Sequence, residues 1–163
     1  MAQVDYFLKV AGIDGEATDA TFAKHIEVES WSWGETNSGT HGSGGGGGAG
    51  KVSMQDISVV TKMGNHSPSL AQACATGRHI PTVELFARKA GDKPQVYLKV
   101  KLTDVLCTSY QTGGSGHGDI VPSDQFALNF AKIEFAYGKQ DAKGKVNALD
   151  QKFGYDLKMN KKL

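Results

Sequence analysis

The 163-residue sequence has few of the features that mark disulfide-rich, membrane-spanning or strongly charged proteins. Its two cysteines, Cys74 and Cys107, lie in apolar surroundings without a C-x-x-C motif, so we interpret them as buried free thiols. No stretch approaches the roughly 18 apolar residues of a membrane helix, so we expect no direct membrane insertion. The 18 basic and 17 acidic side chains nearly balance, so we expect no nucleic-acid partner either.

Signatures of catalysis are also missing. The five histidines show no metal-ligand spacing, no G-x-S-x-G elbow is present, and neither cysteine lies in a catalytic motif. We therefore predict no enzymatic activity, no metal site and no cofactor. One alternative stays open, because Glu35, Asp56, Asp104 and Asp124 could meet in space as a carboxylate pair.

We expect no signal peptide at the N-terminus. The first residues, MAQVDYFLKVAGIDGE, are charged within ten positions and lack the apolar run of a signal peptide, so we expect synthesis in the cytoplasm without a cleaved leader. Near the other end, lysines alternate with aspartates, and we interpret this stretch as a solvated tail. The length fits a single domain over residues 1–163.

Most of the chain alternates between apolar and polar residues with the period of a half-buried strand. The clearest run is residues 95–102, where Val96, Leu98, Val100 and Leu102 share one face. Similar runs cover residues 4–10, 26–33, 52–61, 82–89, 126–137 and 153–159. The sequence therefore predicts a mainly β protein.

Two of these runs change phase, within residues 26–33 and within residues 126–137. A phase change in a long strand suggests a bulge or a strand that passes from one sheet to another, as at the corner of a barrel. We therefore expect a two-sheet β-barrel. The alternative is that both faces of these strands are covered.

One segment has the pattern of a helix. In HSPSLAQACATGRH, Ser67 and Pro68 have the form of an N-cap followed by proline, and Gly77 has the form of a stop. The sequence predicts a short helix over residues 67–77 at the side of the barrel, with Leu70, Ala73 and Cys74 facing the core.

Glycine is concentrated in SGTHGSGGGGGAGK, residues 38–51, which resembles part of a phosphate-binding loop. Such a loop needs a hydroxyl residue after the lysine and a helix behind it, but Val52 follows Lys51 and the next residues favour a strand. We therefore reject a nucleotide site. Residues 36–50 are instead predicted to form a long extended loop that a partner subunit would order, or else a hairpin tip without a role.

Six segments together resemble the haemolysin-coregulated protein (Hcp) family, the tube proteins of bacterial type VI secretion systems. They are WSWGETNSG, GGGGGAGKVSMQD, SPSLAQACATGRHIP, TVELFARKAG, LTDVLCTSYQTGGSG and DQKFGYDLKMN. Each is weak alone, but their order and spacing through nearly the whole chain are specific.

The resemblance implies a structural subunit of the type VI inner tube. The implied assembly is a homohexameric ring that stacks into a tube, is driven out with a spike protein by a contractile sheath, and carries effector proteins in its lumen. The protein would leave the cell through that machine, for the medium or a target cell. The alternative is a free-standing exported adaptor or chaperone that builds no continuous tube.

The resemblance also assigns candidate sites. If Trp31 and Trp33 point into the core, Ser32 points the other way, toward what the family's architecture would make the lumen, where it would contact effectors. The inter-ring assembly loop would comprise Thr40, His41, Gly42, Ser43, Gly44, Gly45, Gly46, Gly47 and Gly48.

Overall fold

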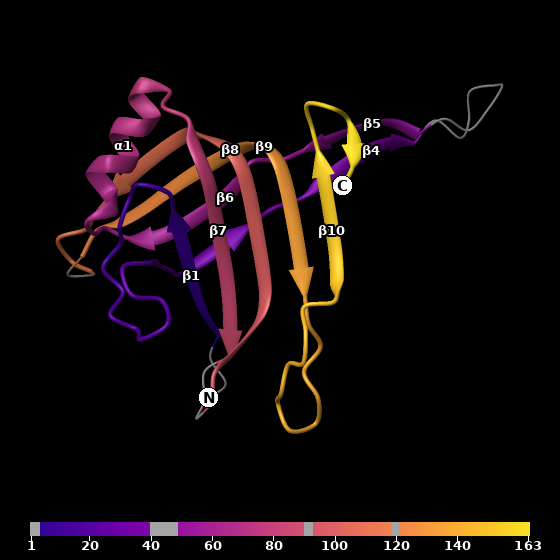
Figure 1. Cartoon of the computed structure of the whole chain (residues 1–163). Coiled ribbons are helices and arrows are strands. Elements are labelled where there is room, and N and C mark those ends of the chain that lie inside the picture. The colour runs from indigo at the N-terminus through magenta and orange to yellow at the C-terminus, as the bar shows by residue number, and fades with distance from the viewer. Residues whose placement is uncertain (1–3, 40–48, 90–92, 119–120) are drawn as a thin grey trace.

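The computed structural model describes residues 4–39, 49–89, 93–118 and 121–163, and shows a mainly β protein with one helix (Figure 1). This confirms the predicted fold class. The strands of the first half are β1 (Val4–Val10), β2 (Ile26–Val28), β3 (Ser30–Ser32), β4 (Glu35–Gly39), β5 (Ala49–Met54) and β6 (Ile57–Lys62). After the helix α1 (His66–Thr76) come β7 (Ile80–Lys89), β8 (Gln95–Gly113), β9 (Ser123–Tyr137), β10 (Gln151–Asp156) and β11 (Lys161–Lys162).

Nine strands form one antiparallel sheet. Its main path runs β11-β10-β9-β8-β7-β1-β2, and β6 joins it by pairing with β9 while β3 pairs with β6. Among the described residues the ladder does not close into a ring of hydrogen bonds, so the word barrel goes beyond what this sheet shows. The β2 end of the path and the β3 end of the branch are joined by the chain itself, because β2 pairs with β1 and β3, which begins one residue after β2, pairs with β6.

Both predicted phase changes mark a change of strand partner. The first falls at Glu29, between β2 and β3, where the Glu29 amide donates to the carbonyl of Val60. The second lies within β9, which keeps β8 along one edge and divides the other edge between β6 and β10. At the same level of β8, Asp104 has φ of 54°, a left-handed conformation that reverses which face the following side chains occupy.

The core fills the concave face of this curved sheet. Leu8, Val59, Leu85, Leu102 and Phe126 belong to one cluster of buried apolar side chains drawn from five strands. A smaller cluster on the outer face packs residues of the segment between β1 and β2 against β1. The alternation of each strand thus decides which side chains are buried.

The helix lies within one residue of its predicted bounds. Leu70 and Ala73 are buried, Cys74 packs against the core, and Gly77 ends the helix with φ of 67°. The predicted N-cap was wrong: Asn65 occupies that position, and the side chain of Ser67 is buried. Ser67 is drawn inward because its hydroxyl accepts from the Gly64 amide and donates to Asp124.

A separate two-stranded hairpin of β4 and β5 extends from the body of the molecule (Figure 1). Glu35, Thr36 and Asn37 pair with Met54, Ser53 and Val52 in register. Residues 36–39 and 49–50, predicted as loop, therefore belong to strands. The predicted loop residues Thr40, His41, Gly42, Ser43, Gly44, Gly45, Gly46, Gly47 and Gly48 lie outside the described residues.

Candidate functional site

Ser32 is exposed on the face of β3 that points away from the core, and its place in a lumen stays a prediction. Trp31 and Trp33 on either side of it pack against the core cluster, whereas Ser32 is exposed. The cause is the alternation of side chains along an extended chain: when the half-buried indoles of Trp31 and Trp33 both pack against the core, the residue between them points outward.

Small uncharged side chains continue from Ser32 across four neighbouring strands. Directly paired residues of antiparallel strands share a face, so the register identifies the rows. One row is Ser32, Ser58, Ala127 and Ser109, and the next is Ser30, Val60, Gln125 and Gln111. These eight residues, which we call the uncharged face, contain no ionisable group.

Asp56 lies beside the uncharged face, and its carboxylate accepts hydrogen bonds from two neutral donors. The Thr108 hydroxyl donates to Asp56 over 2.6 Å and the Asn129 amide donates to it over 2.9 Å. Asp56 lies in the short connection from β5 to β6, and these contacts join that connection to Thr108 of β8 and Asn129 of β9. Charge-assisted hydrogen bonds of this kind are stronger than bonds between neutral groups.

Different partners surround the four carboxylates considered as a catalytic pair, which are those of Glu35, Asp56, Asp104 and Asp124. Asp104 accepts from His79 and from Lys158, both over 2.6 Å, and these partners lower the pKa of Asp104. Asp124 lies near α1, and Glu35 pairs with Met54 in the hairpin. The described residues contain no group of three or more metal-ligating side chains.

The stretch that resembles a phosphate-binding loop continues as a strand. Lys51 and Val52 lie in β5, and the helix that such a loop requires at this point is not there, because β6 follows directly. The strand that the sequence predicted after Lys51 is therefore confirmed.

Sequence reasoning missed a buried polar cluster beneath the start of α1. Asp124 and Thr61 are fully buried, the Ser67 hydroxyl donates to Asp124, and the His66 ring lies 3.0 Å from the Thr61 hydroxyl. Burial lowers the pKa of His66 even though the carboxylates of Asp124 and Glu16 act in the opposite direction. The cluster contains three types of residue common in active sites, but it is enclosed and fastens the helix to β6 and β9. The one available signal was Asp124, a carboxylate at an inward-facing position of an alternating strand.

No helix in the described part of the chain is long and apolar enough to cross a membrane. A mainly β domain with an uncharged strand face and an extended hairpin offers surfaces for contact with other proteins.

Comparison with known proteins agrees with the resemblance in the sequence. The family model described as "Type VI secretion system effector, Hcp" matches residues 7–137. Protein hcp1 of Pseudomonas aeruginosa is 42% identical over 158 residues, covering 96% of this chain and 97% of that protein. The chain belongs to the Hcp family of type VI secretion system proteins.

Solved structures show the same fold. A structure described as that of a type six secretion system protein has a TM-score of 0.92 at 34% identity, covering 99% of this chain and 100% of that chain. Hcp1 from Salmonella typhimurium has a TM-score of 0.78 at 33% identity and covers 100% of both chains. The family is one of secretion proteins and not a known enzyme family.

Proposed function

We propose that this chain is a structural subunit of the type VI inner tube, which assembles as a homohexameric ring, stacks and is exported with effector cargo in its lumen. The observation that carries the proposal is the family match over residues 7–137 together with near-complete overlap with related structures. In this proposal the chain acts by assembly and has no catalytic role. Its further partners are the spike protein and the contractile sheath of the machine.

The uncharged face supports the lumen assignment of Ser32. A wall of hydroxyl, amide and small apolar side chains holds no fixed charge that would trap a passing protein by ion pairing. Contacts on such a wall are short-range hydrogen bonds and apolar contacts, which can hold cargo and release it. We therefore propose that Ser32 contacts effectors from the ring wall.

The hairpin of β4 and β5 supports the stacking assignment. An isolated two-stranded hairpin is only marginally stable in water, so one that extends from the body gains stability when a partner covers it. A heterologous contact of this kind, repeated from ring to ring, gives open-ended growth. We propose that the hairpin and residues 40–48 reach the neighbouring ring.

The native mass of the purified chain tests the ring. The proposal predicts a six-fold multiple of the 17.3 kDa chain mass in light scattering or sedimentation. A monomer over a range of salt and protein concentrations would overturn it and favour the alternative, an exported adaptor or chaperone that binds cargo without building a tube.

A further inference from the structure

The ring requires two complementary surfaces on each copy of the chain, and the distribution of charge along the sequence is uneven. Residues 4–39 contain seven acidic and two basic side chains, whereas residues 132–163 contain eight basic and four acidic ones. The net charge of the whole chain is close to zero, but residues 4–39 are acidic and residues 132–163 are basic. The sheet order places β2 of the first region and β11 of the second at opposite ends of its path.

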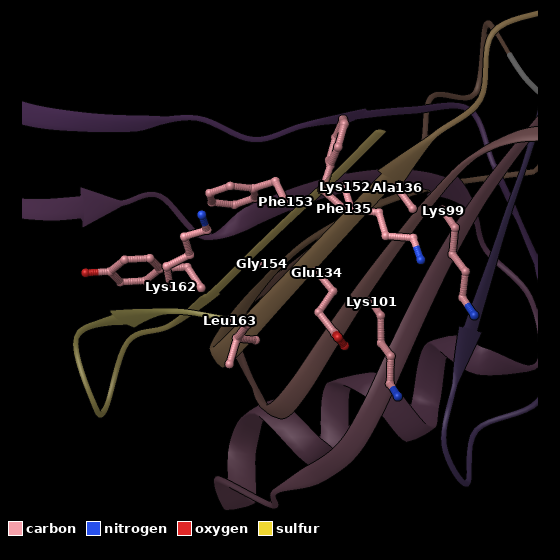
Figure 2. Close-up of a pocket in the computed structure, with 11 residues that line it drawn as sticks. Lys99, Lys101, Glu134, Phe135, Ala136, Lys152, Phe153, Gly154, Lys162 and Leu163 are labelled. Carbon is pink, nitrogen blue, oxygen red and sulfur yellow. The ribbon is translucent and has the colours of Figure 1, made fainter. Parts of the chain in front are cut away.

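The basic end carries a pocket of about 600 Å³ over β8, β9 and β10 (Figure 2). Four lysines line it against a single glutamate, Glu134. Lys99 is already paired with Glu84 over 3.0 Å, but Lys101, Lys152 and Lys162 make no ion pair within the part of the chain that the structure describes. The pocket therefore has positive charge to offer to another molecule.

Apolar side chains are exposed at the same end. Seven large apolar residues are exposed among the described ones, and four of them, Tyr137, Phe153, Met159 and Leu163, lie between the end of β9 and the C terminus. Leu163 and Phe153 also line the pocket (Figure 2). Exposed apolar side chains beside a charged rim are typical of a protein interface.

The acidic end carries a smaller hollow of about 360 Å³, lined in part by Asp5, Asp19, Glu27 and Arg88. Arg88 is paired with Asp19 over 2.5 Å and with Asp5 over 3.4 Å, and its guanidinium holds the pKa of Asp19 well below the usual range. Glu27, exposed on β2, makes no ion pair within the described ranges, and neither does the exposed Glu29. The acidic end therefore has negative charge to offer.

We propose that these two ends meet in the ring, with the basic pocket of β8, β9 and β10 on one copy covered by the acidic end around β2 of the next copy. The inference rests on the proposed ring and specifies which surfaces form it. Each copy contributes one basic and one acidic surface, so the contact is heterologous and is repeated around the ring. Complementary charges set its register, and the exposed apolar side chains of the basic end supply its buried area.

A charge-exchange experiment tests the pairing. The pair Lys152→Glu with Lys162→Glu leaves two lysines against three glutamates in the basic pocket and so reverses its charge. The pair Glu27→Lys with Glu29→Lys replaces the two carboxylates of the acidic end that make no ion pair among the described residues with ammonium groups. Each double variant alone should fall from the ring mass to the monomer mass, a six-fold drop in light scattering. An equal mixture of the two should return to the ring mass with the variants alternating, because every contact again joins opposite charges.

The matched control is Arg78→Glu with Lys51→Glu, the same change of charge at exposed positions that line neither the basic pocket nor the acidic hollow. This control should remain a ring, and circular dichroism should show every variant folded. If the wild-type chain is itself a monomer, the proposed function fails. If the wild-type chain is a ring but the double variants also remain rings, or their mixture stays monomeric, this pairing of surfaces is wrong while the ring stands.

Discussion

The hydroxyl of Ser67 donates a hydrogen bond to the carboxylate of Asp124, and both side chains are buried where α1 meets β9. A buried carboxylate is costly unless donors surround it, so this contact links the position of the helix to that of the strand. The same hydroxyl accepts from the Gly64 amide over 3.0 Å, just before the helix begins. Ser67 thus fastens the helix from the inside, in place of an N-cap at the surface.

Replacing Ser67 with alanine should remove this donor and leave Asp124 with fewer partners. We expect the free energy of unfolding to fall by about 1–3 kcal/mol, the usual effect of leaving a buried polar group unpaired. Urea denaturation measures the change. Ser69→Ala is the matched control, since Ser69 is exposed in the first turn of the same helix; equal effects of the two substitutions would show that the buried contact does not stabilise the fold.

Stability should decrease with falling pH because of His66. Burial lowers the pKa of this ring in the folded protein, so the unfolded chain binds a proton first. Above a pH of about 6.5, the pKa of histidine in the unfolded chain, His66 is neutral in both states and does not lower the free energy of unfolding. As pH falls from this value toward the pKa of His66 in the folded protein, the unfolded chain takes up the proton and the free energy of unfolding decreases. Asp19 and Asp104, whose pKa values are lowered by their cationic partners, contribute only at more acidic pH, below about 4.

The free energy of unfolding measured between about pH 7.5 and 5.5 tests this window. His66→Asn should flatten its pH dependence, whereas His117→Asn, at an exposed loop position, should leave the slope as in the wild type. An unchanged slope in His66→Asn would assign the pH dependence to other groups.

The two thiols should differ in reactivity. Burial raises the pKa of Cys107 to about 12, with a further contribution from the neighbouring Cys74 thiol, so Cys107 carries almost no thiolate at neutral pH. Cys74 is only half-buried. In an Ellman assay at pH 8, about one thiol per native chain should react first, and both should react in denaturant. Cys74→Ser should abolish the fast phase; if the fast phase persists, the assignment is reversed.

Ser32→Gln should weaken cargo binding and leave the ring intact. The larger side chain would extend from the uncharged face into the space that we propose for cargo, while the core on the other side of β3 is untouched. Co-purification of effectors measures the effect, and native mass confirms assembly. Ser69→Gln, on the exposed side of α1, is the control. Unchanged cargo levels would show that Ser32 does not contact effectors.

Deleting residues 44–48 should spare the folded body and the ring but impair stacking and export. The deletion shortens the connection between β4 and β5 without altering either strand. Tube length in electron micrographs and the amount of protein in the culture medium measure the result. Normal tubes together with normal export would rule out this segment as the stacking device.

Much of the fold could be predicted from the sequence because strand alternation records burial directly. Residues 4–10 match β1, and both phase changes mark a change of partner. The open ladder could not be predicted, since alternation says nothing about how strand ends pair. The buried hydrogen bond from Ser67 to Asp124 could not be predicted either. Asp124 is distant in sequence, and the local Ser-Pro pattern favours an N-cap at the surface.

The candidate site could likewise be predicted only in part. The exposure of Ser32 follows from the two tryptophans beside it, but the rest of the uncharged face depends on the register of four strands, which single-sequence patterns do not fix. The C-terminal lysines, interpreted from sequence as a solvated tail, lie beside exposed apolar residues only once β9, β10 and β11 are paired.

Electron cryomicroscopy of the purified wild-type chain tests the central claim most directly, since it gives both the assembly and the orientation of each subunit. The account predicts six-membered rings in which Ser32 and the uncharged face line the inner wall. Monomeric particles, or rings that carry Ser32 on their outer surface, would contradict it.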